Sequence, residues 1–182
     1  IQGVNAINLH NGKPWLTARQ LEDLYEDFCS FDAISLLDNN EEFINRLYKW
    51  HVDENTVTGE VDPKVNIVDF DDWQANRFVA INQYRLDTPG GVKEYIIPDI
   101  VLLVNGLPLV VIECKDVNSF TTEPLHEAVE QLRRYADLRE PEGSALKEGE
   151  PKLFWTNQLM VATHGDDCKF GSITSTEEYF FN

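Results

Sequence analysis

The sequence predicts an α/β fold with a mixed, mainly antiparallel central sheet flanked by helices. The main signal is a pair of apolar runs, residues 100–104 and 107–112, separated by Asn105-Gly106, a dipeptide typical of β-hairpin turns. Residues 78–86 predict a third strand just before this hairpin. Apolar residues spaced three or four positions apart predict helices on both sides of the strands. With 182 residues, the chain is long enough to bury one core.

Two helices are predicted in the N-terminal part. Thr17, followed three residues later by Gln20, has the pattern of a capping box and begins a helix that reaches about Phe28. Asn39 or Asn40 is expected to cap a second helix over residues 41–51. The predicted inner faces are Leu21, Leu24, Tyr25 and Phe28 in the first helix, and Phe43, Ile44, Leu47 and Trp50 in the second.

Further elements complete the predicted sheet and its helical cover. A short strand is expected over residues 65–70. A helix over about 123–138 has Thr122 as its expected cap, Pro124 in its first turn, and a buried stripe of Leu125, Ala128, Val129, Leu132 and Ala136. Residues 140–152 are expected to form a loop, because they are rich in Pro, Gly and charge. Strands are expected over residues 158–163 and 168–174.

Charged residues stand at the ends of the central hairpin. Asp99 precedes the first strand, and Glu113 and Lys115 end the second. Residues two apart in a strand share a face, so Glu113 and Lys115 point the same way and Cys114 points the opposite way. Buried charges must be paired, bound to metal or solvated in a cleft. Cys114 itself is expected to be a small core residue.

The register of the hairpin decides whether Asp99 joins Glu113. A two-residue turn at Asn105-Gly106 pairs Asp99 with Ile112, on the face away from Glu113. A three-residue turn with a bulge places Asp99 opposite Val111, on the same face as Glu113. A shared site for the two acids therefore requires an odd-length turn or a bulge in this hairpin.

These residues resemble a known family. Pro98-Asp99, thirteen further residues, and then Glu113-Cys114-Lys115 are similar to the PD-(D/E)xK nuclease signature. The whole run from Ile97 to Lys115 closely resembles the N-terminal endonuclease domain of the restriction (R) subunit of type I restriction enzymes. The resemblance covers about the last 110 residues, from Asn76 onward, and is loose before that. It includes Asn82-Gln83, Glu127-Ala128, Gln131 to Tyr135, Leu153-Phe154, Asn157-Gln158 and, more loosely, Lys169 to Thr174.

The resemblance implies a restriction-endonuclease-like core and a magnesium-dependent type I site-specific deoxyribonuclease. Asp99, Glu113 and the backbone carbonyl of Cys114 would bind Mg2+, which prefers oxygen ligands. Lys115 would stabilise negative charge, or orient and deprotonate the attacking water; both roles remain open. Gln131 and Tyr135 lie four apart on one side of a helix. By resemblance they orient Lys115 or a phosphate; otherwise they are the polar flank of an amphipathic helix.

Composition limits how the chain can act on DNA. Its 15 basic and 32 acidic residues give a net charge of −17, whereas a self-sufficient DNA-binding domain is usually basic. By resemblance, double-stranded DNA would be held together with methyltransferase and specificity subunits and with the helicase-like motor domains of a longer chain. The sequence contains no GxxxxGK[ST] phosphate loop, so ATP would act only through those domains.

The predicted organisation is a single endonuclease domain over residues 1–182, a fragment of a longer chain, with a helical N-terminal part (1–75) and a nuclease core (76–182). The three cysteines are too few and scattered for a disulfide framework. No signal peptide or membrane span is visible, so a cytoplasmic location is expected. Two alternatives remain: a non-catalytic scaffold or subunit-docking module with the same fold, and a generic α/β domain in which Glu113 and Lys115 form a surface ion pair.

Overall fold

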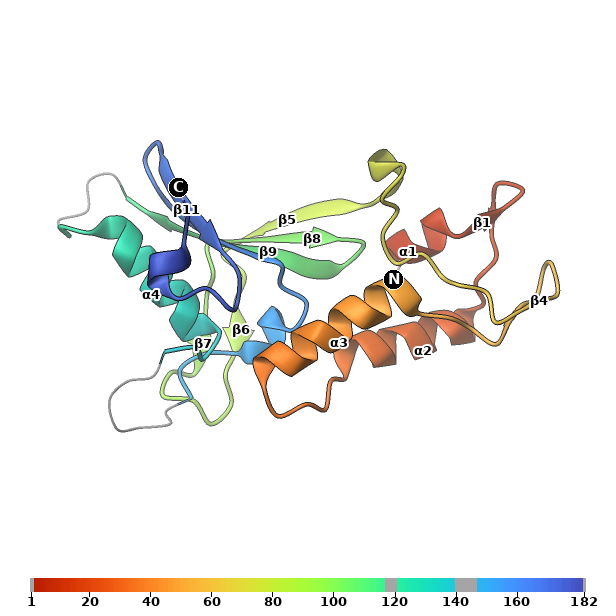
Figure 1. The fold of residues 1–182 in the computed structure, drawn as a ribbon, viewed down its shortest axis with the longest axis horizontal. Coiled ribbons are helices and arrows are strands. Elements are labelled where there is room, and N and C mark those ends of the chain that lie inside the picture. The colour runs from red at the N-terminus through yellow and green to blue at the C-terminus, as the bar shows by residue number, and fades with distance from the viewer. Residues whose placement is uncertain (1, 117–120, 140–146, 182) are drawn as a thin grey trace. The chain divides into compact units, whose positions relative to one another are not determined.

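The computed structural model describes residues 2–116, 121–139 and 147–181 (Figure 1). The α-helices are α1 (Gln2–Ile7), α2 (Ala18–Cys29), α3 (Leu36–Lys49) and α4 (Pro124–Tyr135), and the 3-10 helices are η1 (Trp73–Ala75), η2 (Pro151–Phe154) and η3 (Glu177–Tyr179). The strands are β1 (Leu9–His10), β2 (Lys13–Pro14), β3 (Glu54–Asn55), β4 (Glu60–Val61), β5 (Phe78–Asn82), β6 (Leu86–Asp87), β7 (Tyr95–Ile96), β8 (Ile100–Val104), β9 (Leu107–Lys115), β10 (Leu159–His164) and β11 (Asp167–Gly171).

A five-stranded sheet forms the centre of the fold, with strand order β11-β10-β9-β8-β5. Strand β10 runs parallel to β9, in a register that pairs Ala162 with Glu113 and His164 with Lys115. Strand β11 runs antiparallel to β10. Helix α4 packs against β10 and β11. The predicted fold class, a mixed and mainly antiparallel sheet flanked by helices, is therefore confirmed, and it is compatible with a restriction-endonuclease-like core.

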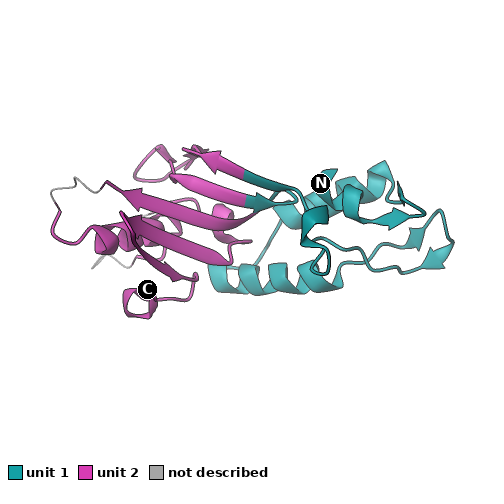
Figure 2. Ribbon diagram, turned by 90° about the horizontal axis from the view of Figure 1, so that it is seen from above, with its two compact units in different colours: residues 1–79, 103–107 teal, residues 80–102, 108–182 magenta. Residues whose placement is uncertain are grey.

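The chain divides into two compact units (Figure 2). The first comprises residues 1–79 and 103–107, and contains α1, α2 and α3. The second comprises residues 80–102 and 108–182, and contains α4, β10 and β11. The tip of the β8–β9 hairpin thus belongs to the first unit, while the charged residues at the far ends of these strands belong to the second.

The helices of the first unit begin where their caps allow. Thr17 and Gln20 form the predicted capping box of α2. In contrast, α3 begins five residues before the predicted start of its helix, because the Ser35 side chain accepts from Asp38 N and caps it. The side chain of Asn39 instead binds both backbone groups of Ala33. The expected Asn39 or Asn40 cap is therefore wrong.

The inner faces of α2 and α3 are narrower than their sequences predict. Leu24 and Phe28 are buried in α2, as are Phe43 and Leu47 in α3, and Trp50 is buried directly after α3. Tyr25 and Ile44 are exposed instead. Their positions fit the helical period, but both lie at the margin of the apolar stripe, where tertiary packing decides burial.

The strand predicted over residues 65–70 does not form. Val65 and Ile67 are fully buried, but a side chain rather than a neighbouring strand satisfies the backbone between them. The Asn8 amide accepts from Asn66 N at 2.9 Å and donates to Asn66 O at 2.7 Å. The apolar run is therefore buried as an irregular segment, since its backbone partners come from an amide.

Two predicted elements of the second unit are shortened. The strand predicted over residues 78–86 breaks at Gln83, whose φ of 52° does not fit a strand. Helix α4 ends at Tyr135, and Asp137 then adopts a φ of 55°. Its N-cap is Glu123, without a side-chain bond, so the expected Thr122 cap is wrong. Of the loop expected over residues 140–152, residues 140–146 lie outside those the structure describes.

The two C-terminal strands form close to their predicted positions, as β10 and β11. Ala128, Val129, Leu132 and Ala136 are buried as expected, and Leu125 is partly exposed. Across the described residues, no helix combines the length and apolar character that crossing a membrane requires.

Candidate active site

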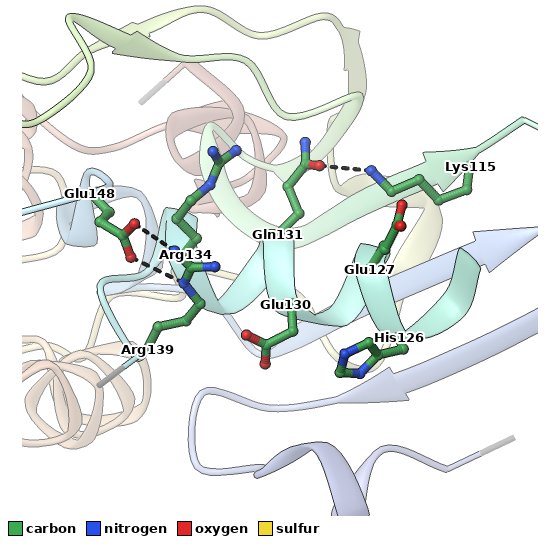
Figure 3. Close-up of a pocket in the computed structure, with 8 residues that line it drawn as sticks. All are labelled: Lys115, His126, Glu127, Glu130, Gln131, Arg134, Arg139 and Glu148. Carbon is green, nitrogen blue, oxygen red and sulfur yellow. Dashed lines mark hydrogen bonds and ion pairs between the residues drawn. The ribbon is translucent and has the colours of Figure 1, made fainter. Parts of the chain in front are cut away.

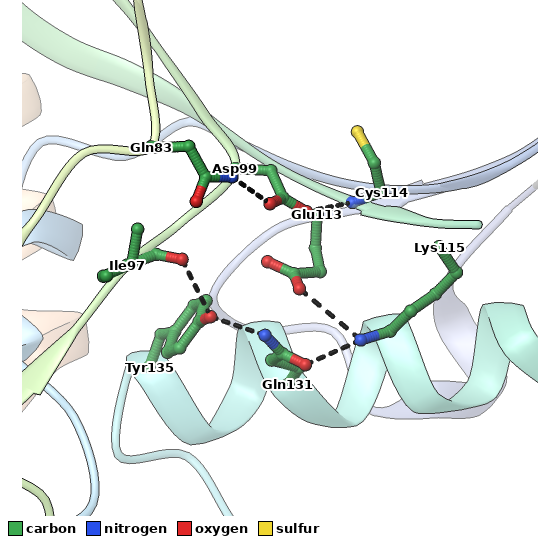
Figure 4. A network of polar contacts seen from close by, with 8 residues as sticks. All are labelled: Gln83, Ile97, Asp99, Glu113, Cys114, Lys115, Gln131 and Tyr135. Atoms are coloured by element: carbon green, nitrogen blue, oxygen red, sulfur yellow. Dashed lines mark hydrogen bonds and ion pairs between the residues drawn. The ribbon is translucent and has the colours of Figure 1, made fainter. Parts of the chain in front are cut away.

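The acidic and basic residues at the end of the central hairpin lie together in the second unit (Figure 4). Asp99 lies in a bend just before β8, and Glu113 and Lys115 are near the end of β9. The carboxylate of Asp99 accepts from Cys114 N through Oδ2 at 2.8 Å. Lys115 Nζ lies 3.5 Å from Glu113 Oε1. The structure therefore brings together the three residues that the sequence motif predicts.

The hairpin turn is the two-residue form. Asn105 and Gly106 both have positive φ, 52° and 96°, as in the primed turns that suit hairpins. An odd-length turn is therefore not what brings Asp99 to Glu113. Asp99 precedes the first residue of β8, so the alternation of side chains along that strand does not set its direction.

Glu113 is an unusual group for a strand end, because its side chain is almost fully buried. The residue is 3% exposed, and Oε2 has no hydrogen-bond partner among the described residues. Burial is the main reason that the pKa of Glu113 rises from 4.5 to about 7, and the charge of Asp99 adds to it. Lys115 opposes the rise. Near neutral pH this carboxyl is therefore half protonated, and a bound cation would favour its ionised form.

Helix α4 holds Lys115 through a chain of hydrogen bonds. Lys115 Nζ donates to Gln131 Oε1 at 2.7 Å, and Gln131 Nε2 donates to Tyr135 Oη at 2.5 Å. Tyr135 Oη in turn donates to Ile97 O at 3.1 Å. Only one orientation of the Gln131 amide serves both neighbours, since the ammonium can only donate. Figure 4 shows the chain running along one side of the helix.

This arrangement places Gln131 in contact with Lys115, and Tyr135 in contact with Gln131. Tyr135 is buried, and burial raises the pKa of its hydroxyl above the usual value. The hydroxyl therefore keeps its proton and can donate a hydrogen bond to Ile97 O. The bonds extend from the backbone before Asp99 to the ammonium group of Lys115.

Cys114 differs from its predicted environment. Its side chain is exposed, whereas the sequence predicted a small core residue. Strand alternation explains the difference, because Cys114 points away from the face that carries Glu113 and that α4 covers (Figure 4). Its backbone N–H serves the site by donating to Asp99. Its carbonyl as a metal ligand stays a prediction.

Gln83 contacts the site, although the sequence analysis included it only in the family resemblance and assigned it no role. Gln83 Nε2 donates to Asp99 Oδ1 at 2.7 Å, and Gln83 N donates to Asp99 O at 2.8 Å. Asp99 Oδ1 thus accepts from Gln83 Nε2, and Asp99 Oδ2 accepts from Cys114 N, so each carboxylate oxygen has one donor. A glutamine at a strand end carries no signal for this role. Its left-handed φ, visible only in the structure, aims the side chain at Asp99.

The donor set fits a divalent cation that keeps most of its water. Within the described part of the chain, no group of three or more His, Cys, Asp or Glu residues could hold a metal. Two carboxylates are present, Asp99 and Glu113, and one buried oxygen, Glu113 Oε2, has no partner. Magnesium is commonly held by one or two carboxylates together with waters and substrate phosphates. These residues therefore suit magnesium better than an ion that requires a full protein cage.

Comparisons with known proteins show which family the chain resembles. The family described as "Type I restriction enzyme R protein N terminus" matches residues 4–179. The chain is 31% identical over 168 residues to the type I restriction enzyme HindI endonuclease subunit of Haemophilus influenzae, covering 92% of this chain and 15% of that protein. A Methanocaldococcus jannaschii protein, provisionally named type I restriction enzyme MjaIXP endonuclease subunit, is 25% identical over 174 residues, covering 95% of this chain and 16% of that protein.

The match extends further than the motif alone indicates. It begins at residue 4 and so includes the first 75 residues, where the sequence resemblance is loose. The chain spans only about 15% of the relatives' length. Both relatives are named as endonuclease subunits. The chain belongs to the family of type I restriction enzyme R subunit N-terminal domains.

Proposed function

We propose that this chain is a magnesium-dependent endonuclease domain that hydrolyses DNA phosphodiester bonds within a type I restriction subunit. The observation that carries the proposal is the buried Glu113 carboxylate, which lies beside Asp99 and Lys115, has a pKa of about 7, and has one oxygen without a partner among the described residues. Perturbed carboxyl groups of this kind cluster at functional sites. The match to the type I restriction enzyme family supports DNA as the proposed substrate.

Asp99 and Glu113 would hold Mg2+. When bound, the ion polarises the scissile phosphate and stabilises the charge that develops during hydrolysis. Asp99 is already oriented for this task, because donors from Gln83 and Cys114 fix both of its oxygens. Glu113 must lose its proton before it can coordinate a cation, so cation binding releases a proton at Glu113 near neutral pH.

Lys115 would act as a cation that stabilises negative charge. Its ammonium group faces two acceptors, Gln131 Oε1 at 2.7 Å and Glu113 Oε1 at 3.5 Å. An ammonium group that already donates to two acceptors is oriented as a hydrogen-bond donor, which suits contact with a phosphate oxygen better than removal of a proton from water. When Glu113 turns to a cation, Gln131 would still hold Lys115 in place.

The wider reaction would depend on partners. Double-stranded DNA is the proposed substrate, held together with methyltransferase and specificity subunits and with motor domains of the longer chain. ATP would be used by those motor domains, and we propose no ATP-dependent step at this site.

Plasmid cleavage by the intact restriction subunit in its complex tests the function. We expect Asp99→Ala and Lys115→Ala each to lower the magnesium-dependent nicking rate by about a thousandfold, with ATP hydrolysis and translocation retained. Removing magnesium with a chelator should stop cleavage by the unmodified complex. Matched controls are Asp166→Ala and Lys13→Ala, since both residues are exposed and lie outside the site.

The outcomes separate the alternatives. Normal cleavage by the Asp99 and Lys115 variants would exclude the assigned site. A complex that translocates DNA but does not cut it, even with all native residues, would favour a non-catalytic scaffold or subunit-docking module.

A further inference from the structure

Two cavities of the second unit meet at the same pair of side chains on α4. One has a volume of about 490 Å³ and the other about 480 Å³, and Gln131 and Arg134 line both. Lys115 lines only the first, and Tyr135 lines only the second. Arg134 thus stands at the boundary between the predicted catalytic groups and a second space beside them. Figure 3 shows its guanidinium group on the same side of the helix as Gln131.

Among the described residues Arg134 has no hydrogen-bond acceptor, unlike the arginines near it. Its Nε is buried without a hydrogen-bond partner, and no described carboxylate forms an ion pair with it. Arg133 donates to the carbonyls of Ser175 and Leu138, and Arg139 pairs with Glu148. Leaving a buried charged donor without an acceptor is costly. A free guanidinium group on so acidic a chain is therefore suited to a ligand that brings its own negative charge.

The charges around each cavity indicate which one an anion would enter. The first cavity is lined by three acids, Glu127, Glu130 and Glu148, whose charges balance those of three cations, Lys115, Arg134 and Arg139. The second has two cations, Lys93 and Arg134, and one acid, Glu94. Lysine and arginine side chains both bind phosphate, and the planar guanidinium can bind two phosphate oxygens at once.

Arg134 also influences the catalytic carboxylate through its charge. It lowers the pKa of Glu113, although burial and Asp99 outweigh it and keep that pKa near 7. Gln131, which bonds Lys115, lines both cavities together with Arg134, so a phosphate on Arg134 would lie one cavity away from Lys115. Arg134 also lies over the Tyr135 ring, 5.2 Å from its centroid, which limits its movement.

We propose that Arg134, together with Lys93 in the lining of the second cavity, binds a phosphate of the DNA strand next to the one that is cut. This inference rests on the proposed nuclease function. The strand would pass from the Lys115 side of Gln131 to the Arg134 side, with one phosphate on each cation. Arg134 would then position the strand rather than take part in bond breaking.

The test measures single-turnover cleavage by the intact restriction subunit in its complex, at several salt concentrations and at pH 7 and 8.5. We expect Arg134→Gln to slow cleavage at least about tenfold and Arg134→Lys to recover part of the loss, with ATP hydrolysis unchanged. Because one phosphate contact is lost, the slope of log rate against log salt should become shallower by about 0.9. Arg19→Gln, at a residue whose side chain is 91% exposed, removes the same charge outside the site and should change none of these.

Three results would overturn the phosphate contact. Cleavage by Arg134→Gln at the native rate is the first. The second is a loss that disappears at pH 8.5, since Arg134 would then act only through the ionisation of Glu113. The third is an Arg134→Lys variant as slow as Arg134→Gln with a lowered Tm, which would indicate a structural role. Failure of the nuclease function itself is distinguished by Asp99→Ala, which would then cut normally.

Discussion

At the scale of single residues, the protonation of Glu113 affects both the stability of the fold and the chemistry of the site. Its carboxylate is buried, and one of its oxygens has no described partner. Burial, with help from Asp99, raises its pKa to about 7. The fold therefore disfavours the ionised form, and a change of pH or a bound cation alters both the stability and the chemistry of this site.

Glu113 should make the free protein less stable as pH rises. Its pKa is higher in the folded than in the unfolded chain, so folding takes up a proton between about pH 4.5 and 7. The penalty is absent below about pH 4.5, grows as pH rises, and reaches roughly 3 kcal/mol above pH 7. Denaturant unfolding of Glu113→Gln without divalent cations should lack this component of the pH dependence. An unchanged pH dependence would contradict the burial of the charged form.

The same titration should control the use of magnesium. Because Glu113 must be ionised to coordinate a cation, the magnesium concentration for half-maximal cleavage should fall by about tenfold per pH unit below pH 7. It should level off above that value. Cleavage rates of the complex across a magnesium series at pH 6, 7 and 8 would measure this. A requirement independent of pH would mean that Glu113 is not a ligand.

Gln83 should act as a positioning residue for Asp99. Replacing it with Ala removes the bond to Asp99 Oδ1 and frees the carboxylate to rotate. We expect the magnesium concentration for half-maximal cleavage to rise about tenfold to a hundredfold, the range for a lost partner of a metal ligand, while the rate at saturating magnesium falls less. Gln74→Ala, at an exposed glutamine, is the control. Equal loss at all magnesium concentrations would indicate a different role.

At the scale of elements, the turn of the β8–β9 hairpin depends on one buried asparagine. Asn105 Nδ2 donates to Ile67 O and Asn76 Oδ1, and Asn105 Oδ1 accepts from Arg77 N. Asn11 provides a natural comparison, because its φ of 50° is similar and its side chain is exposed.

Replacing Asn105 with Ala should therefore destabilise the protein by about 3 kcal/mol, because buried partners are left unsatisfied. Asn11→Ala should cost about 1 kcal/mol, since it affects the turn conformation and one solvent-exposed hydrogen bond to His10 but leaves no buried group unsatisfied. Unfolding in urea measures both. Equal values would show that the turn conformation, and not the buried amide, determines the stability.

Helix α4 should act as one unit with Lys115. Tyr135→Phe removes the hydroxyl between Gln131 and Ile97 but keeps the buried ring. We expect cleavage to fall about tenfold, with little change in Tm. Gln131→Ala should slow cleavage as well, and the double variant should be little worse than the more affected single variant, because both changes break one chain of bonds. Tyr179→Phe, at an exposed tyrosine, is the control. Additive losses would indicate separate roles.

At the scale of the whole molecule, charge limits what the chain does alone. With a net charge of −17, it should bind duplex DNA no better than about 10⁻⁵ M near 150 mM salt. Lowering salt from 200 to 50 mM should strengthen binding less than about tenfold, whereas a protein with many phosphate contacts gains a thousandfold or more. Fluorescence anisotropy with labelled DNA would measure this, and a steep salt dependence would contradict it.

The sequence by itself determined the fold class, the central hairpin and the residues that end its strands. These features depend on local patterns, namely an Asn-Gly turn between apolar runs, a capping box at Thr17 and helical spacing in α4. Such patterns act over a few residues, so they can be read without knowing what packs against them. Predictions that relied on them were close to the structure.

Tertiary structure alone decided the remainder. Burial turns Glu113 into a group with a pKa near 7, and a left-handed residue aims Gln83 at Asp99. The lack of any ion pair between Arg134 and a carboxylate, among the described residues, is likewise visible only once the chain is folded. Each of these depends on which groups from distant parts of the chain meet, and on how much water remains between them. Local sequence patterns reveal neither the contacts between distant residues nor the burial of their side chains, because both arise from packing.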